Sequence, residues 1–369
     1  VLLYVFRRSG LYPFGDKTIS WGDMDSQIVP LLCDLKDVLT GKSGFFYSHN
    51  NAGGMNFAGL FFYYLSSPFH LLVVFVKKED MMSFVNVLVL LKLTAAAFTA
   101  YLCLRHTQSD LSVGFAVILS VFYGACGYCF LYYQIVLWLD AVYLFPLLFW
   151  GAERLVKKGK PALYTAALTA SVLICLYVSY MFVLFLLLYM GLTLYFRRSE
   201  EKKQGRVAPF FAPLSGEIAR KFVLSSLIAA GLSAICYLPL LSAVFSSART
   251  GLNVLGSLKN AGAETSLSTV LPVLLGELFL FPFFFSRRPV REDVKYAALL
   301  LLLTVPFFFE PVNLLWNTGS YMAFPARYGF ITNFLMILMA ARGLSDRDSG
   351  FLTALCGEEQ EKDLLSGLF

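Results

Sequence analysis

The sequence predicts an all-α polytopic membrane protein that crosses the bilayer about ten times, counting an incomplete first crossing. Its 369 residues are 58% hydrophobic and 15% charged, with a mean hydropathy of +0.67. Soluble domains are about 45–50% apolar and about 25% charged. The apolar residues form successive runs, each near the length that a bilayer requires. Basic residues cluster in short loops between these runs, so the net charge of +6 indicates membrane topology rather than nucleic-acid binding.

We expect one transmembrane domain over residues 1–369. Residues 1–6 (VLLYVF) form an apolar run too short to cross the bilayer, which predicts the outer end of a truncated first span. Residues 7–81 are predicted to form a large first extracytoplasmic loop, and residues 82–341 about nine transmembrane helices. Residues 342–369 are predicted to be a cytoplasmic segment whose C-terminal continuation is missing.

Two stretches of the first loop are predicted to be interfacial helices. Residues 26–39 are too polar to span, but apolar residues recur on one helical face, with charged residues off that face. The apolar face consists of Ile28, Leu31, Leu32, Leu35 and Leu39, and the charged residues are Asp34, Lys36 and Asp37. Residues 57–76 are long enough to span, yet Pro68 and His70 interrupt them. A crossing there would also disturb the alternation of basic loops, so we expect this stretch to be interfacial or re-entrant.

The remaining spans are predicted from apolar runs of near-bilayer length. They are residues 82–104, 112–131, 139–156, 161–178, 180–196, 221–245, 268–286, 294–311 and 326–341. When the first loop is placed outside, the inner loops are rich in Lys and Arg and the outer loops hold few cations. The sequence therefore predicts a multi-pass protein whose first loop faces away from the cytoplasm.

With this orientation, the unusual polar residues gather on the outer side. They come from five separate connections: Asp23, Asp25, Gln27, His49, Asn50 and Asn56; Tyr132, Tyr133, Gln134, Trp138 and Asp140; Tyr177, Ser179 and Tyr180; Glu310, Asn313, Trp316 and Asn317; and Arg327 with Tyr328. This inventory suits a sugar attached to a lipid phosphate. Carboxylates can act as a general base or hold a divalent cation, and Arg binds phosphate in a bidentate fork. Glycines beside His49, Asn50 and Asn56 let the backbone approach a ligand.

Several motifs occur in order along the chain. They are G-D-M-D-S-Q before an amphipathic segment, N-N-A-G-G-M-N-F, Y-Y-L-S-S-P-F, L-L-K-L, W-L-D-A-V-Y-L-F-P-L, Y-V-S-Y-M and F-P-A-R-Y-G-F. Together they resemble the bacterial YfhO-type membrane proteins over essentially the whole chain, which corresponds to the N-terminal part of a longer protein. The resemblance implies an integral-membrane glycosyltransferase of the GT-C class, with a GT-C-like transmembrane helix bundle in the bacterial cell membrane.

The resemblance also implies a reaction on the extracytoplasmic side. A sugar would pass from a polyprenyl-phosphate carrier to a cell-envelope acceptor, such as a teichoic-acid-type polymer or another surface glycan. The catalytic Asp of the first loop matches Asp23, with Gln27 four residues on. The implied partners are the lipid bilayer, the lipid-linked sugar and the envelope polymer, and no nucleic acid.

The residues of the first loop each have an alternative interpretation. Asp23 is the base of an inverting transfer or the N-cap of the amphipathic helix. Asp25 is a second catalytic carboxylate, a ligand for a divalent cation (Mg²⁺ or Mn²⁺), or a helix cap. His49 is a metal or sugar ligand, or a loop residue that bonds to the backbone. Gln27, Asn50 and Asn56 are candidate hydrogen-bond partners of the sugar.

Charged residues deeper in the chain are also candidates. Lys92 lies in the middle of a span, where a charge indicates function. It can pair with a carrier phosphate or with a buried acid such as Glu277 or Glu153. Asp140 lies just inside the outer boundary and is expected to orient a catalytic or sugar-binding group. Arg327 is predicted to bind the leaving phosphate, with an interfacial anchor as the alternative.

Three aromatic residues, Trp138, Tyr180 and Tyr328, complete the predicted substrate-binding set. Rings at this depth can stack on a sugar or belong to the aromatic belt of the membrane interface. A lipid-linked sugar flippase or transporter is the alternative function, because it would use the same groups for binding without chemistry. A transporter should carry polar residues through the midplane, whereas here they gather at one face, which favours the enzyme.

Overall fold

The computed structural model of the protein describes residues 1–51, 53–203, 216–238, 273, 290–318 and 326–345. Most of the described residues are helical, as expected for an all-α membrane protein. The described part contains one short antiparallel pair of strands, in which Tyr47 faces Asn56. Part of the expected topology lies outside the described residues, namely the span 268–286, the end of the span 221–245, Glu277 and residues 346–369.

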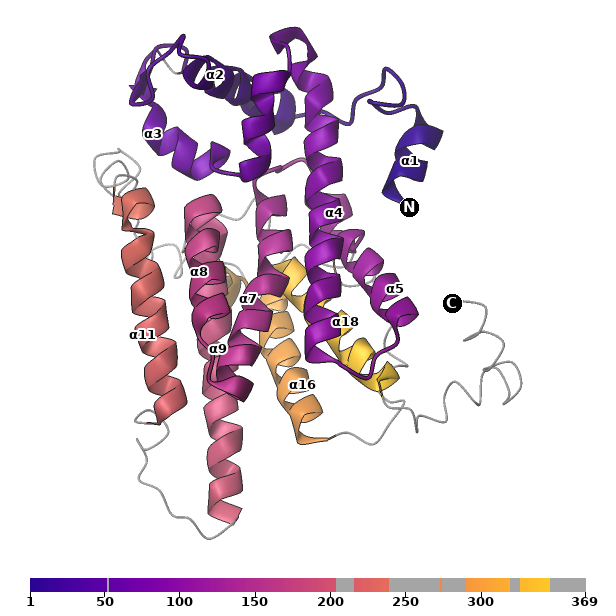
Figure 1. The fold of residues 1–369 in the computed structure, drawn as a ribbon, viewed down its shortest axis with the longest axis vertical. Coiled ribbons are helices and arrows are strands. Elements are labelled where there is room, and N and C mark those ends of the chain that lie inside the picture. The colour runs from indigo at the N-terminus through magenta and orange to yellow at the C-terminus, as the bar shows by residue number, and fades with distance from the viewer. Residues whose placement is uncertain (52, 204–215, 239–272, 274–289, 319–325, 346–369) are drawn as a thin grey trace.

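Long helices run side by side, and short elements cover one end of them (Figure 1). We call the covered end the loop end. The long helices are α4 (Met81–Thr107), α5 (Val113–Gly124), α7 (Trp138–Lys158), α8 (Ala162–Ile174), α9 (Leu176–Lys203), α11 (Glu217–Leu232), α16 (Arg291–Thr304) and α18 (Gly329–Leu344). The short elements of the chain are α1 (Leu2–Ser9), η1 (Met24–Ile28), α2 (Val29–Leu39), β1 (Tyr47–Ser48), β2 (Met55–Asn56), α3 (Phe57–Leu60), η2 (Phe61–Leu65), η3 (Pro68–Phe75), η4 (Lys78–Asp80), α6 (Gly127–Tyr132), η7 (Val305–Phe308) and α17 (Glu310–Trp316). The layer over the loop end is built from α2, α3 and their neighbours in the first loop (Figure 1).

Helix α7 is the centre of the bundle, with α4 on one side and α8 on the other. A glycine permits the closest of these approaches. A Cβ on Gly151 would lie 2.6 Å from the Cα of Tyr164 on α8, so only Gly lets the two backbones approach this closely. Phe145 anchors the other side of α7 in an aromatic core, where its ring contacts rings of α9 and α18. These are Phe182, Phe185, Phe330 and Phe334, with centroid distances of 5.6, 5.0, 5.9 and 5.4 Å.

Three stretches of the described residues are helical, long and apolar enough to cross a membrane: Lys78–Thr107, Val113–Tyr132 and Leu176–Ser199. Two shorter apolar helices, Ala162–Ile174 and Gly329–Leu344, lie where longer spans are expected. Helix α8 ends early because Cys175 leaves the helical conformation, with φ −146° and ψ 61°. Helix α9 then starts at Leu176, so the predicted boundary between these two spans lies four residues too late.

Residues 57–75 form a sharply bent pair of helical segments, which we call the bent hairpin. The bend between Phe57–Leu65 and Pro68–Phe75 is 109°. Ser67 is extended (φ −62°, ψ 133°) immediately before Pro68, because a residue that precedes proline is driven out of the helical region. A bend of this kind is found in broken spans and in re-entrant loops, and it lies where Pro68 was expected to interrupt the segment.

The amphipathic segment is helical from Met24 to Leu39, since η1 continues into α2. Four members of its predicted apolar face, Ile28, Leu31, Leu32 and Leu35, are buried, but Leu39 is 42% exposed at the frayed last turn. Asp34, which lies off that face, is nevertheless only 7% exposed. The loop that contains Ser48 folds over Asp34 and covers it.

Candidate functional site

Three polar residues of the predicted catalytic motif lie on the first helical turn of the amphipathic segment. The Asp23 side chain is exposed, occupies the N-cap position of η1 and makes no capping hydrogen bond. Within the described part of the chain, Asp23 has no hydrogen-bond or ion-pair partner. The alternative interpretation of Asp23 as a helix cap therefore lacks its defining contact.

Asp25 and Gln27 are each bonded to a neighbouring segment. Asp25 is half-buried, and its Oδ1 accepts a hydrogen bond from the Ser20 hydroxyl. Gln27 is exposed, and its Nε2 donates to the Tyr64 hydroxyl over 3.3 Å. Since Tyr64 belongs to the bent hairpin, the predicted catalytic motif and the bent hairpin are in direct contact.

The bent hairpin reaches from Gln27 towards a second polar group. The rings of Tyr63 and Tyr64 meet at 4.5 Å, and η2, which contains both residues, packs against α9, whose first turn contains Tyr177. The sequence motif Y-Y-L-S-S-P-F contains both tyrosines, yet sequence alone gave them no role. The bent hairpin thus contacts both Gln27 of the first loop and α9, where Tyr177 bonds to Arg327.

Arg327 lies between aromatic rings at the loop end. Its guanidinium carbon is 5.4 Å from the ring centroid of Trp138 and 5.4 Å from that of Tyr177. Nη1 also donates a hydrogen bond to the Tyr177 hydroxyl. The buried Nε has no hydrogen-bond partner among the described residues. A positively charged group that is held by two rings and keeps an unused donor can bind a phosphate oxygen.

The predicted aromatic residues have different environments. Trp138 is buried, and its ring contacts Tyr132 edge to face at 5.5 Å. Tyr180 is 38% exposed, and its hydroxyl donates to the Leu315 carbonyl over 2.9 Å. Tyr328 is fully buried between Phe307 and Trp316, with centroid distances of 4.6 and 4.4 Å. Tyr180 is therefore accessible to a ligand, whereas Tyr328 belongs to the core.

Lys92 and Asp140 form an ion pair with a distance of 2.7 Å between Nζ and Oδ2. Their exposed fractions are 0% and 1%. Lys92 Nζ also lies 3.1 Å from His70 Nε2 and 3.1 Å from the Val136 carbonyl oxygen. The second oxygen of Asp140 accepts a hydrogen bond of 2.6 Å from the Ser67 hydroxyl. The sequence-based choice of Glu153 as a structural partner of Lys92 was wrong.

The loop between β1 and β2 is held by its own polar residues. Asn50 Nδ2 and the Ser48 hydroxyl donate to the two oxygens of Asp34, each over 2.8 Å. The side-chain Oδ1 of Asn56 accepts a hydrogen bond from the Gly59 backbone amide over 3.1 Å and so caps α3. His49 is exposed, with its ring 4.9 Å from that of Tyr47. Of the three predicted ligands in this loop, His49 is the one whose side chain makes no hydrogen bond within the described part of the chain.

A second cluster of charges lies at the end of the bundle opposite the loop end, and sequence alone did not identify it. Glu153 of α7 is buried and accepts hydrogen bonds from the hydroxyls of Tyr189 and Tyr296. Its Oε2 is 2.7 Å from Lys157 Nζ, and its Oε1 is 3.9 Å from Lys295 Nζ. This carboxylate thus contacts both α9 and α16.

Arg342 extends the opposite-end cluster to α18. Its Nε donates to Asp293 over 2.7 Å, and its Nη1 donates to Glu292 over 3.0 Å. The Lys295 ammonium and the Arg342 guanidinium also lie over the Tyr296 ring, at 4.5 and 5.3 Å. The acids and bases of this cluster neutralise one another, which is characteristic of a structural network.

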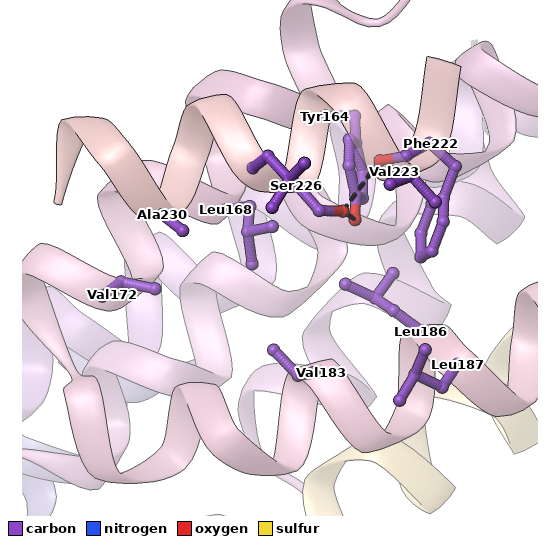
Figure 2. Close-up of a pocket in the computed structure, with 11 residues that line it drawn as sticks. Tyr164, Leu168, Val172, Val183, Leu186, Leu187, Phe222, Val223, Ser226 and Ala230 are labelled. Carbon is purple, nitrogen blue, oxygen red and sulfur yellow. Dashed lines mark hydrogen bonds between the residues drawn. The ribbon is translucent and has the colours of Figure 1, made fainter. Parts of the chain in front are cut away.

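An apolar groove of about 360 Å³ opens between α8, α9 and α11 (Figure 2). The polar feature of this groove is a hydrogen bond of 2.8 Å between the hydroxyls of Tyr164 and Ser226. On α9, Tyr180, Val183 and Leu187 are all exposed at helical spacing. This stripe connects the groove with the start of α9, where Tyr177 contacts Arg327.

A divalent cation would have few protein ligands in this site. No group of three or more His, Cys, Asp or Glu side chains that could hold a metal ion occurs in the described segments. Asp23 and Asp25 supply carboxylates two residues apart. Side chains two positions apart on a helix do not face each other, so the two carboxylates do not form a shared site, and a cation would meet at most one of them together with substrate phosphates.

The helix bundle and the polar groups at its loop end define an α-helical membrane protein. The chain belongs to the YfhO family, because the family model described as bacterial membrane protein YfhO matches residues 1–354. This match confirms the resemblance that the sequence motifs indicate. Neither the curated proteins nor the solved structures include a match to the chain.

Proposed function

We propose that the protein is a GT-C-class glycosyltransferase. It transfers a sugar from a polyprenyl-phosphate carrier to a cell-envelope acceptor on the extracytoplasmic side of the membrane. The observation that supports this proposal best is the presence of two groups at the loop end. Among the described residues, the exposed carboxylate of Asp23 has no hydrogen-bond or ion-pair partner, and the Arg327 Nε has no acceptor. The bent hairpin contacts Gln27 through Tyr64, and it packs against α9, where Tyr177 bonds to Arg327.

The reaction assigns each group a separate task. Asp23 removes the proton from an acceptor hydroxyl, and the oxygen attacks the anomeric carbon of the donor sugar. The bond between that carbon and the phosphate oxygen breaks, and polyprenyl phosphate leaves with the electron pair. Attack from the face opposite the leaving group inverts the anomeric configuration. Arg327 stabilises the negative charge that develops on the leaving phosphate.

Other residues bind the substrate in this proposal. Tyr180 presents an accessible ring, and His49 presents an exposed imidazole to the sugar or its phosphate. Asp25 holds Mg²⁺ or Mn²⁺ when a cation accompanies the donor, and such a cation would neutralise phosphate charge. The acceptor is a teichoic-acid-type polymer or another surface glycan.

The apolar groove supplies a place for the carrier's isoprenoid chain. Its lining is almost entirely hydrocarbon, and the exposed stripe on α9 leads from it towards Tyr177. An isoprenoid chain that leaves the groove along this stripe would bring its phosphate to the loop end. The hydrophobic effect would then hold the chain while Arg327 binds the headgroup.

The experiment that tests this function measures sugar transfer from a synthetic polyprenyl-phosphate sugar in proteoliposomes. Asp23→Asn is expected to reduce turnover by about 10²–10⁴-fold, the usual contribution of a general base, with donor binding retained. Asp16→Asn is the matched control, because Asp16 is an exposed acid of the same loop, and it should leave transfer unchanged.

Two outcomes would contradict the proposal. If Asp23→Asn moves sugar at the wild-type rate, Asp23 is not the base, and Asp25 becomes the candidate for that role. Donor movement across the bilayer without transfer, in the wild type and in both variants, would favour a flippase for lipid-linked sugars.

A further inference from the structure

We propose that Lys92, Asp140, Ser67 and His70 form a positioning network that fixes the bent hairpin against α7 and thereby aligns the two parts of the site. The effect on catalysis rests on the function proposed above, whereas the effect on the bent hairpin does not. None of the four residues is a catalytic residue in this proposal. They act through Tyr63, Tyr64 and Trp138.

The network joins three separate parts of the fold. Asp140 belongs to α7, Lys92 to α4, and Ser67 with His70 to the bent hairpin. Both oxygens of Asp140 are used, Oδ2 by Lys92 at 2.7 Å and Oδ1 by Ser67 at 2.6 Å. Lys92 in turn lies 3.1 Å from His70 Nε2. The bent hairpin is therefore attached to the bundle at two positions, on either side of Pro68.

The same geometry argues against a direct role of Lys92 in phosphate binding. An ammonium group has three protons, and Lys92 has three acceptors at 2.7–3.1 Å: Asp140, His70 and the Val136 carbonyl. Its exposed fraction is 0%, and its charge is already neutralised by Asp140. No donor remains for a carrier phosphate. The intramembrane charge is thus used within the protein.

The position of the network explains how it affects the site. In the bent hairpin, Tyr63 and Tyr64 lie only a few residues before Ser67. Tyr64 accepts a hydrogen bond from Gln27, and η2 packs against α9, whose first turn contains Tyr177, the hydrogen-bond partner of Arg327. Trp138, whose ring lies under the Arg327 guanidinium, is two residues before Asp140. Anchoring Ser67 to Asp140 therefore fixes the elements that hold the phosphate side of the site relative to the first loop. A misplacement of about 1 Å between such groups can reduce a rate about 10²-fold.

The neighbouring break between α8 and α9 adds a third attachment. The Ser66 hydroxyl donates to the Ile174 carbonyl over 3.1 Å. This hydrogen bond satisfies a carbonyl at the end of α8, just before the first turn of α9, which contains Tyr177. Ser66 and Ser67 thus hold the turn of the bent hairpin against two different helices.

The test separates positioning from stability with four variants. Ser67→Ala and Asp140→Asn each remove one anchor. The double variant Lys92→Met/Asp140→Leu replaces the buried ion pair with apolar side chains, a change that is often neutral or stabilising. Glu153→Gln is the control, since it removes a buried acid of the same helix that does not contact the bent hairpin.

Hydrogen exchange of peptides covering residues 61–76 is measured together with thermal stability and with kcat and KM for sugar transfer. Ser67→Ala, Asp140→Asn and the double variant should each exchange about tenfold faster in this segment. All three should have a kcat reduced at least tenfold. The double variant should keep nearly wild-type thermal stability. Glu153→Gln should unfold at lower temperature while exchange in the bent hairpin and kcat stay close to wild type.

Wild-type exchange and wild-type kcat in the double variant would overturn the proposal, because the ion pair would then supply stability alone. Faster exchange with an unchanged kcat would overturn the catalytic half of it. If the wild-type protein transfers no sugar, the proposed function fails. Exchange alone then decides whether the network positions the bent hairpin, and wild-type protection in Ser67→Ala and the double variant would refute that role.

Discussion

Glu153→Gln is expected to destabilise the protein through loss of a single buried charge. Gln has nearly the same shape as Glu, and its amide oxygen can still accept hydrogen bonds from Tyr189 and Tyr296. The substitution therefore leaves most of the packing in place. It removes the negative charge that faces Lys157 at 2.7 Å and the buried Lys295 at 3.9 Å. Lys295 then keeps a buried positive charge with less compensation.

The size of the effect follows from the contacts that remain. Breaking a buried ion pair by removing one partner costs about 3–5 kcal/mol. Lys157 is partly exposed and has Glu292 as a second acceptor at 3.7 Å, and Lys295 keeps the Tyr189 and Tyr296 rings at 4.9 and 4.5 Å. We therefore expect the lower end of the range, about 3 kcal/mol. An unfolding entropy of about 2.1 cal/mol/K per residue converts this cost, for 369 residues, into a fall in Tm of about 4 °C.

Thermal unfolding in detergent, followed by tryptophan fluorescence, measures this shift. Glu217→Gln is the matched control. Glu217 also pairs with a lysine one turn on, Lys221 at 2.6 Å, but its side chain is 68% exposed. An exposed pair of this kind contributes little, so its loss should leave Tm close to that of the wild type. Equal Tm values for Glu153→Gln and Glu217→Gln would refute the reasoning that burial makes the Glu153 charge important.

Three further predictions concern the loop end and the groove. Arg327→Gln should lower kcat/KM for the lipid-linked donor about 10–100-fold, because it removes a charge-assisted hydrogen bond to the phosphate, and Arg327→Lys should recover part of this loss in the transfer assay. Ala230→Trp should fill the apolar groove and raise KM for a long-chain donor, while KM for a short-chain donor with the same headgroup stays unchanged. Asn56→Ala should cost about 1 kcal/mol as the loss of a helix cap, seen as faster proteolysis near α3, and Asn56→Asp should restore resistance. Equal KM changes for both donor lengths would contradict the prediction for Ala230→Trp. Wild-type resistance of Asn56→Ala to proteolysis would contradict the prediction for Asn56.

The spacing of apolar residues in the sequence predicted helices that bury a single apolar face. The apolar residues of α2 recur at helical spacing, and four of the five expected residues are buried. The same pattern could not show that Asp34 is buried, because the groups that cover it come from a loop more than ten residues later. Ser48 and Asn50 both donate to its carboxylate. Burial that depends on a distant loop has no signature in the helix itself.

The sequence also could not predict which charged side chains pair between helices. A lysine in an apolar span must find a compensating group, so the existence of a partner for Lys92 was predictable. The identity of that partner was not predictable, because several acids occur in or beside apolar runs of the sequence, and Asp140 is 48 positions away in the chain. The motifs that contain Asp23, Gln27 and Arg327 were recognisable, whereas the contacts through the bent hairpin follow from a 109° bend that only the fold reveals.

The two charged networks give α7 a single role in the architecture. Asp140 and Glu153 are 13 positions apart, about 20 Å along a helix. Asp140 attaches α4 and the bent hairpin near the loop end, and Glu153 attaches α9 and α16 at the opposite end. Buried charges are too costly in an apolar surrounding unless they are paired, so each carboxylate specifies which helix lies beside it. Apolar packing alone is less selective, because most side chains of the bundle could pack against several neighbours. Helix α7 is therefore the frame that holds the site at the loop end in register with the rest of the bundle.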